Sequence, residues 1–530
     1  MIQISDTTLR DGAQAEGISF SLDDKIQMVR ELDDLGIGWI EAGNPAANPL
    51  DASFFQAMAG LPPLRHARIC AFGSTCRPGA DSPEDPALRV LSRVHADQKT
   101  IFGKASLRHV EQVLRCSPEE NLRIIRDSVS FLCQGGIPVW FDAEHFFDGY
   151  RENPAYALKT LRTAMEAGAQ RLILCDTNGG SMPDHVAEAV HAVRQEIGIP
   201  LGIHTHNDCG LAVANSLAAL QAGCDLVQGT MGGVGERCGN ADLNTLIPLI
   251  SLKMKENCLP EGHLVRLTHV SRVAAEIMNL APNENAPFVG YSAFAHKGGM
   301  HIDAVLKDQA SYEQVDPEAV GNHRRFLLSD QSGRAGIYAQ LGRFLPDLNR
   351  DSPEIASVVK KLKQQEAEGY TYENADASFE LLALDTLGRR QQFFRVLDYH
   401  VLSQHKTGSG PDAQAYLKVE VNGREGINAA EGEGPVNAMD MALRKTLAQF
   451  YPSVSNMHLQ DFKVRVINSQ GTASLVRVSI ESTDGVHLWK TVGVHHNIIL
   501  ASLRALVDSV DYMLTRYVPA SEIQTASVMG

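Results

Sequence analysis

The feature that most constrains the fold of this chain is a regular alternation of two kinds of segment over its first 260 residues. Short runs rich in β-branched and aromatic residues, which favour strands, alternate with longer segments whose apolar residues recur at three- and four-residue spacing, as on one face of a helix. Strands separated by helices predict a parallel sheet, because each helix returns the chain to the edge where the next strand starts. The predicted strands are residues 2–8, 39–42, 68–72, 99–102, 138–142, 171–175, 201–206 and 226–230.

Eight such strands with helical crossovers, in about 250 residues, predict an α/β fold of the closed (β/α)8 barrel type, also called a TIM barrel. An open, doubly wound sheet is the alternative that this pattern leaves. Several predicted helices end in a glycine just before the next strand, as at Gly36, Gly168 and Gly223. Glycine is typical there because it adopts the left-handed conformation that ends a helix.

The chain changes character twice after the barrel. Residues 263–372 are helical and irregular, which predicts helical linker subdomains between the barrel at 1–262 and a C-terminal domain at 373–530. That last part predicts an α+β fold with hairpin turns at Asn422-Gly423 and Asp484-Gly485. A weak internal repeat indicates a duplicated βββα unit without an obvious catalytic cluster. Its predicted strands are residues 379–384, 416–421, 462–466, 475–480 and 488–492.

Composition excludes several classes of function. The net charge of -15 disfavours nucleic acid or an anionic membrane as a partner. No apolar run approaches the about eighteen residues of a membrane-spanning helix, and the chain does not start with an export signal. The nine cysteines are scattered and form no CxxC pair, as is typical of reduced thiols in a cytoplasmic protein.

Polar residues gather where the predicted barrel strands end. The carboxyl ends of barrel strands are where such barrels place their active sites, so five clusters at these ends predict one site. They are residues 6–12 (DTTLRDG), 142–144 (DAE), 176–178 (DTN), 204–208 (HTHND) and 235–240 (GERCGN).

Three of these polar residues suit a metal ion. His204 and His206 are two apart in a strand, so both imidazoles point the same way, and Asp11 ends a neighbouring strand. One carboxylate, two imidazoles and an amide oxygen favour magnesium, manganese or catalytic zinc over structural zinc. Alone, the two histidines could equally be hydrogen-bonded polar residues. Arg10 could stabilise a developing alkoxide or enolate, or pair with Asp6 or Asp11.

The motifs at 6–12, 204–208 and 235–240 resemble those of a family of metal-dependent enzymes with one type of barrel. It comprises isopropylmalate, homocitrate and citramalate synthases, with hydroxymethylglutaryl-CoA lyase as a relative. The resemblance covers essentially the whole chain, because the barrel, a linker with SAFAHKGGMH at 292–301 and the duplicated module follow the order of synthases with an allosteric domain.

Within this family the chain is most similar to the citramalate synthase branch. The similar stretches include residues 141–149 (FDAEHFFDG) and 491–494 (TVGV). One departure lies at residues 44–47 (NPAA), where that branch commonly has a Trp-Pro-Gly-Ser-like run. These residues are expected to form the floor of the substrate pocket, so the departure bears on which 2-oxo acid the pocket accepts.

The resemblance implies a metal centre and its chemistry. The residues that match its metal ligands are Asp11, His204, His206 and Asn240. The ion would be Mn2+ or Mg2+, with Zn2+ as a third option. Arg10 matches the arginine that contacts the keto oxygen of the substrate.

Four further residues match substrate-binding or catalytic positions of the family. Thr177 matches the threonine that holds the carboxylate of the 2-oxo acid, and Glu144 matches the acid near the reacting centre. His301 and Tyr312 match linker residues that reach a barrel active site, usually that of the partner subunit. His301, working with Glu144, is the candidate base, because imidazole titrates near neutral pH.

The implied activity is that of an acyltransferase, which condenses acetyl-CoA with pyruvate to give citramalate and CoA. Isopropylmalate synthase, acting on 2-oxoisovalerate, is the alternative within the family. A metal-dependent acyl-CoA lyase is an alternative of another class, although such lyases usually stop after the barrel. A biotin-dependent carboxyltransferase and a barrel that serves only as a scaffold are less favoured interpretations.

The C-terminal module points to two roles, the assembly of subunits and the regulation of activity. The resemblance implies a homodimer and feedback inhibition by isoleucine, the amino acid to which citramalate leads. We expect isoleucine to bind near Gly434 and Gly493, where turn amides and helix N-termini would hold its charged groups. The alternative is a module that serves only in dimerisation.

Overall fold

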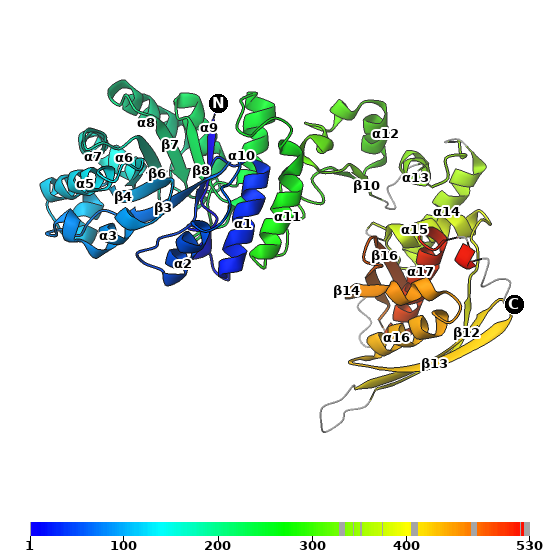
Figure 1. Cartoon of the computed structure of the whole chain (residues 1–530). Coiled ribbons are helices and arrows are strands. Elements are labelled where there is room, and N and C mark those ends of the chain that lie inside the picture. The colour runs from blue at the N-terminus through cyan, green and yellow to red at the C-terminus, as the bar shows by residue number, and fades with distance from the viewer. Residues whose placement is uncertain are drawn as a thin grey trace. The chain divides into compact units, whose positions relative to one another are not determined.

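The computed structural model of the chain describes residues 2–327, 334–342, 344–349, 352–373, 375–403, 412–467, 474–519 and 521–523 (Figure 1). The chain divides into two compact units. The first comprises Met1–Phe294 and Gln314–Arg324, and the second comprises Ala295–Glu313 and Arg325–Gly530. Within the described residues, no helix is both long and apolar enough to cross a membrane.

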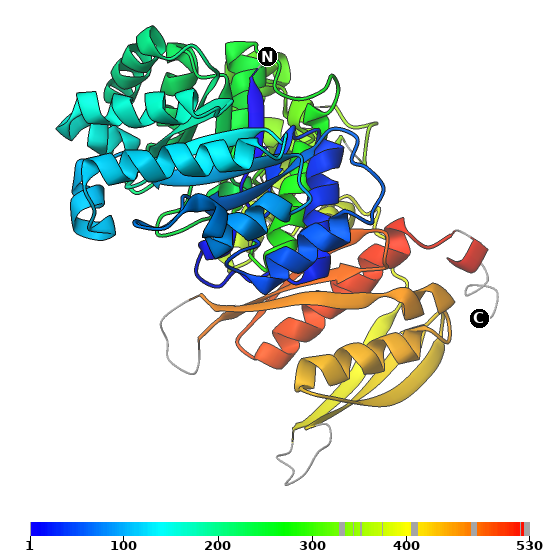
Figure 2. The same cartoon turned by 60° about the vertical axis from the view of Figure 1, so that its left-hand side comes forward.

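The first unit contains a closed barrel of parallel strands, in which each strand pairs with the next and β1 pairs with β8. This confirms the predicted TIM barrel and excludes the open sheet. Helices surround the strands in both views (Figure 1, Figure 2). The strands are β1 (Gln3–Asp6), β2 (Trp39–Glu41), β3 (Arg68–Ser74), β4 (Gln98–Lys104), β5 (Val139–Glu144), β6 (Arg171–Asp176), β7 (Leu201–Thr205) and β8 (Leu226–Gly229).

The barrel helices begin and end where the sequence pattern indicates. Ser21 caps α1 in a capping box with Asp24, and Gly36, Gly168 and Gly223 end helices with positive φ angles of 93°, 107° and 123°, as predicted. The helices are α1 (Leu22–Leu35), α2 (Pro49–Met58), α3 (Pro86–Arg93), α4 (Leu107–His109), α5 (Pro118–Cys133), α6 (Phe146–Glu152), α7 (Pro154–Glu166), α8 (Pro183–Glu196), α9 (Ala212–Ala222), α10 (Leu243–Pro248) and α11 (Leu267–Ile277).

The second unit begins with the linker elements. Apolar residues of α13 and α14, including Ile337 and Ile355, share a core with Phe379 and Val492, so this part of the linker belongs to the hydrophobic core of the C-terminal module. The linker elements are β9 (Ala295–His296), α12 (Gly299–Lys307), β10 (Arg325–Phe326), α13 (Arg334–Leu341) and α14 (Pro353–Ala367).

The C-terminal module contains two three-stranded antiparallel sheets, β11-β12-β13 and β14-β15-β16, each followed by a helix. This confirms the duplicated βββα unit and both hairpin turns. Its elements are α15 (Asp376–Thr386), β11 (Arg395–Ser403), β12 (Ala413–Val421), β13 (Arg424–Gly432), α16 (Pro435–Leu447), β14 (His458–Val466), β15 (Val476–Thr483), β16 (Leu488–His495) and α17 (Ile498–Arg516).

The strand predicted at 379–384 is wrong, because these residues lie inside helix α15. The helix is buried on nearly every side, so its apolar residues run almost continuously and resemble a short buried strand. Strands β11 and β13 were not predicted. β11 is largely exposed, and β13 carries Gly426 and Asn428, which are poor strand formers.

Candidate active site

Three side chains converge at the carboxyl end of the barrel strands. Asp11 follows β1, whereas His204 lies in β7 and His206 directly after it. Their ligand atoms all lie within 4.8 Å of one another, and all three residues are buried. The two Nε2 atoms of the histidines are 3.3 Å apart, and His204 Nε2 is 3.7 Å from an Asp11 carboxylate oxygen. These residues form a group that could hold a metal ion.

Asn240 adjoins this group from the loop after β8. Its backbone forms an isolated bridge with His206, and its Nδ2 donates hydrogen bonds to Asp11 Oδ1 at 2.7 Å and to Val234 O at 3.1 Å. Its Oδ1 atom is buried and lacks a hydrogen-bond partner within the described residues. A buried amide oxygen beside a carboxylate and two imidazoles fits a divalent cation.

The charges of the group also fit a cation. Burial lowers the pKa of His204 to about 3 and also lowers the pKa of His206, so both imidazoles are neutral at neutral pH. Burial alone would raise the pKa of Asp11, but Arg10 and the two histidines lower it well below its usual value. One carboxylate and two neutral imidazoles are a mixed ligand set for a divalent ion.

Arg10 is held on three sides. Its Nε donates to Glu41 Oε1 at 2.6 Å, its Nη1 donates to Asp11 Oδ2 at 2.7 Å, and its guanidinium lies 4.0 Å from the ring centroid of Phe72. Asp6, the other carboxylate considered for Arg10, instead accepts hydrogen bonds from Thr8. The arginine is therefore fixed in direction beside the candidate metal group.

Glu41 was not predicted as a site residue, although it is buried at the end of β2 and holds Arg10. Its position resembles that of the other polar residues at strand ends, so that the same signal could have identified it. Lys104 was missed in the same way. It ends β4 and forms an ion pair with Glu144 at the end of β5.

The remaining barrel residues lie at neighbouring strand ends. Thr177 follows β6, and its Oγ1 accepts a hydrogen bond from the backbone N–H of His145 at 2.8 Å. Because the threonine oxygen accepts there, its own O–H is available to donate to a ligand. Asp142 is buried within β5, and burial raises its pKa well above the usual value of a carboxyl group.

A cavity of about 410 Å³ opens beside Arg10 and Phe72. Its lining includes Asn44 and Ala47, from the run in which the chain departs from the citramalate branch. That run therefore lies beside the arginine that is expected to contact substrate.

His301 and Tyr312 belong to the second unit. Their rings are stacked with centroids 4.3 Å apart, and 51% of Tyr312 is exposed. The structure thus brings these two predicted residues together. Their catalytic roles stay a prediction.

Comparisons with known proteins cover nearly the whole chain. Residues 1–273 match the HMGL-like family, residues 288–369 match the homocitrate synthase post-HMGL domain-like family, and residues 373–514 match the LeuA allosteric (dimerisation) domain. An (R)-citramalate synthase of Geobacter sulfurreducens is 47% identical over 516 residues, which cover 97% of this chain and 98% of that protein.

Two further relatives show that the chain is more similar to (R)-citramalate synthases than to a probable 2-isopropylmalate synthase. An (R)-citramalate synthase of Synechocystis sp. is 47% identical over 522 residues, covering 96% of this chain and 95% of that protein. A probable 2-isopropylmalate synthase of Methanopyrus kandleri is 30% identical over 517 residues, covering 97% of this chain and 99% of that protein. The chain therefore belongs to the HMGL-like family and, within it, to the group of the (R)-citramalate synthases.

Proposed function

We propose that this protein catalyses a Claisen-type condensation of acetyl-CoA with pyruvate, which gives (R)-citramalate and CoA. The observation that carries this proposal is the group of Asp11, His204 and His206 beside a fixed Arg10, in a chain 47% identical to (R)-citramalate synthases over nearly its whole length. The product would enter a threonine-independent route to isoleucine in the cytoplasm.

The proposed site binds pyruvate through its two oxygen-bearing groups. Asp11, His204, His206 and Asn240 would hold a divalent ion, Mn2+ or Mg2+ in preference to Zn2+, which supplies Lewis-acid polarisation of the keto group when bound. Thr177 would donate its O–H to the carboxylate of pyruvate. The bonds of Arg10 to Glu41 and Asp11 use Nε and Nη1, so Nη2 is the nitrogen that can turn to the keto oxygen.

The condensation needs a base and a group that stabilises charge. His301, with Glu144, would take a proton from the methyl group of acetyl-CoA, and the resulting carbanion would attack the keto carbon of pyruvate. Arg10 would then stabilise the alkoxide by a charge-assisted hydrogen bond. Water would finally cleave the thioester and release CoA. Lys104 supports this scheme, because its ion pair with Glu144 holds that carboxylate in place at the end of β5.

Aromatic rings near Arg10 favour a small 2-oxo acid. The rings of Phe72 and Phe102 are stacked with centroids 5.5 Å apart, and Phe72 also carries the guanidinium of Arg10. These two rings restrict the space beside Arg10, which suits the methyl group of pyruvate better than the branched side chain of 2-oxoisovalerate.

A panel of 2-oxo acids tests the proposed reaction. We expect acetyl-CoA-dependent thiol release to be fastest with pyruvate. Its kcat/KM should exceed that of 2-oxobutyrate by only about 10- to 200-fold, because a difference of one methylene changes the binding of the transition state only modestly. Faster turnover of 2-oxoisovalerate would instead identify an isopropylmalate synthase. Cleavage of an acyl-CoA without any condensation would identify a lyase.

We further propose that isoleucine inhibits the enzyme by binding to the C-terminal module. A cavity of about 650 Å³ lies where α16 and α17 begin, beside β14. α16 has no side-chain cap at Gly434, whereas Asn497 caps α17. The free N–H groups of the first turn of α16 suit the carboxylate of an amino acid, and Phe462 and Ile499 offer an apolar lining. Gly493 is buried inside β16 and does not line this cavity, whereas Gly434 does, so the proposed site includes Gly434 alone of the two glycines.

Calorimetry with isoleucine, leucine and valine tests this control. We expect isoleucine to bind and to weaken substrate binding, and linkage requires the substrate to weaken isoleucine binding by the same factor. Ile499→Arg should fill the cavity and reduce isoleucine affinity at least about tenfold, since it removes apolar contacts and adds a charge. The control Val486→Arg, at a position that is 84% exposed, should bind isoleucine normally. Normal binding to the Ile499→Arg protein would place the effector elsewhere.

A further inference from the structure

His204 has a second ring nitrogen, whose role the candidate metal group does not explain. Its Nε2 atom lies 3.3 Å from Nε2 of His206 and 3.7 Å from an Asp11 carboxylate oxygen, so Nε2 is the nitrogen that faces the candidate ion. Its Nδ1 atom is buried and has no hydrogen-bond partner within the described residues. A histidine that binds a metal through Nε2 carries its proton on Nδ1 and donates it to an acceptor, which fixes the tautomer and the direction of the ring. His204 therefore needs an acceptor beside Nδ1.

The pairing of the barrel strands places Gln228 beside His204. Strands β7 and β8 run parallel, and Ile203 of β7 pairs with Val227 of β8. His204 and Gln228 are the next residues of these two strands, so the same register sets them side by side. Neighbouring strands lie about 4.8 Å apart, and two side chains on the same face of such a pair can therefore touch.

Both side chains face the interior of the barrel. Gly202 faces inward, because a Cβ atom at this position would lie 2.4 Å from Ile173 and 2.9 Å from Leu226. Leu226 belongs to a small buried core with residues of β5 and β6, strands that β8 can meet only across the inside of the barrel. Side chains two residues apart on a strand share a face, so His204 faces inward like Gly202. For the same reason Gln228 faces inward like Leu226.

The amide of Gln228 suits the role of the missing acceptor. The residue is 1% exposed, and neither Oε1 nor Nε2 has a hydrogen-bond partner of good geometry within the described residues. Because a buried amide without a partner is costly, a donor on the neighbouring strand would stabilise it. Burial is the largest influence on the pKa of His204 and lowers it, whereas Gln228 raises it. An acceptor has this effect because it stabilises the protonated ring, so the amide oxygen is the part of Gln228 that acts on His204.

We propose that Gln228 is a positioning residue of the metal centre. Its amide oxygen accepts the Nδ1–H of His204, which keeps the proton off Nε2 and holds the ring with Nε2 toward the ion. Without this acceptor the imidazole could carry its proton on Nε2, and that tautomer cannot bind a metal through the same atom. The inference rests on the proposed function in one respect, because it needs a divalent ion at Asp11, His204 and His206.

Binding of Mn2+ to the full chain, after dialysis against a chelator, tests this role without any measurement of activity. Gln228→Leu removes the acceptor at similar volume and should weaken Mn2+ binding by about 10- to 100-fold, the usual effect of losing a group that orients a metal ligand. Gln228→Glu keeps an oxygen in the same place. It should bind Mn2+ at least as tightly as the parent, because a carboxylate partner makes an imidazole a stronger ligand. Electron paramagnetic resonance of free Mn2+ measures the affinities.

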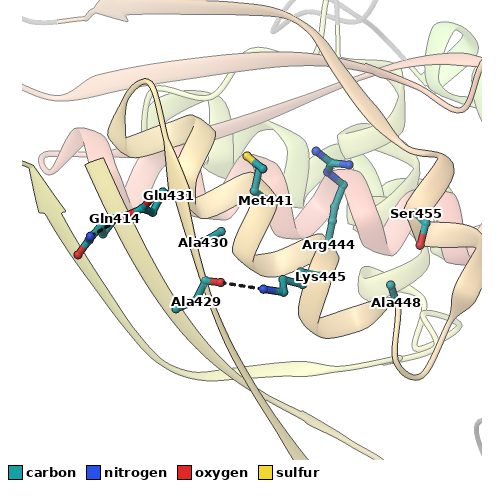
Figure 3. A pocket seen from close by; sticks show the side chains of 9 residues that line it. All are labelled: Gln414, Ala429, Ala430, Glu431, Met441, Arg444, Lys445, Ala448 and Ser455. Atoms are coloured by element: carbon teal, nitrogen blue, oxygen red, sulfur yellow. Dashed lines mark hydrogen bonds between the residues drawn. The ribbon is translucent and has the colours of Figure 1, made fainter. Parts of the chain in front are cut away.

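A matched control makes the same substitution in the second unit. Gln414 is exposed, and its amide donates to Glu431 at 2.8 Å beside a surface cavity of about 790 Å³ (Figure 3). Gln414→Leu should therefore bind Mn2+ like the parent.

The outcomes separate this role from the proposed reaction. Parent-like Mn2+ affinity in a folded Gln228→Leu protein overturns the role of Gln228. If circular dichroism shows that Gln228→Leu does not fold, Gln228→Glu decides alone, and weaker binding than in the parent overturns the role. A parent chain without affinity for Mn2+ would overturn it together with the metal centre. The expected affinities in a parent that does not condense acetyl-CoA with pyruvate would refute the reaction and support the role of Gln228.

Discussion

At the scale of single residues, the candidate active site depends on burial combined with opposite charge. Burial lowers the pKa values of His204 and His206, while the charge of Arg10 lowers the pKa of Asp11 and keeps it ionised. The site thus presents neutral imidazoles and a carboxylate without any need for proton release at neutral pH. Such a group is prepared to bind a cation rather than a proton.

We predict that His206→Ala abolishes most metal binding and most activity. The variant loses one ligand of a small set, so its metal affinity should fall about 100-fold or more, with far-UV circular dichroism unchanged. Elemental analysis after dialysis measures the metal, and His191→Ala, which removes an exposed histidine of α8, serves as the control. Equal metal content and normal turnover in the two variants would contradict the assignment.

At the scale of elements, helices α15 and α17 are joined by buried charges. Burial raises the pKa of Asp511 to about 6, against the opposing effect of Arg390, and burial raises the pKa of Asp508 as well. Arg390 nevertheless binds both carboxylates. The contact of Arg390 with these two carboxylates is therefore sensitive to pH.

We predict that Asp511 makes the fold less stable as pH rises. An acid whose pKa is raised on folding favours the folded state below its unfolded pKa of about 4, and this contribution is lost as pH rises through about 6. The free energy of unfolding should fall by about 2 kcal/mol from this group between pH 4 and pH 7. Asp511→Asn should remove this part of the slope in calorimetric unfolding. Parallel pH profiles of the variant and the parent would show that Asp511 titrates normally.

At the scale of the whole molecule, the proposed chemistry draws on both compact units. The candidate metal group and Arg10 lie in the first unit, whereas His301 and Tyr312 lie in the second. In a homodimer, the second unit of one chain could serve the barrel of its partner.

We predict that two inactive variants complement one another. Arg10→Ala and His301→Ala should each lose most activity, and mixed dimers should regain up to about a quarter to a half of it, because one of the two sites combines an intact barrel with an intact His301. Thiol release after co-refolding or subunit exchange measures the recovery, and each variant exchanged with itself is the control. Mixed dimers without recovered activity would leave His301 to act within its own chain or outside catalysis.

Much of this protein could be predicted from the sequence because the relevant signals are local. Alternating strand and helix periods define the barrel, and polar residues at strand ends, such as Asp11 and His204, mark the site because parallel strands end on one face. The hairpin turns at Asn422 and Asp484 likewise follow from short sequence signals. The eight barrel strands and the duplicated unit could be predicted in the same way, whereas β11 and β13 could not.

Other features depended on tertiary structure, because they join residues that are distant in sequence. Glu41 becomes a partner of Arg10 only when barrel closure brings β1 and β2 side by side, and Lys104 meets Glu144 only through the pairing of β4 with β5. The periodicity of α15 misled the prediction because burial on nearly all sides removes the polar face that identifies a helix. The sequence by itself determined the periodic elements and the chemistry available at their ends. The tertiary structure decided which charged residues meet, because these contacts depend on packing between distant segments.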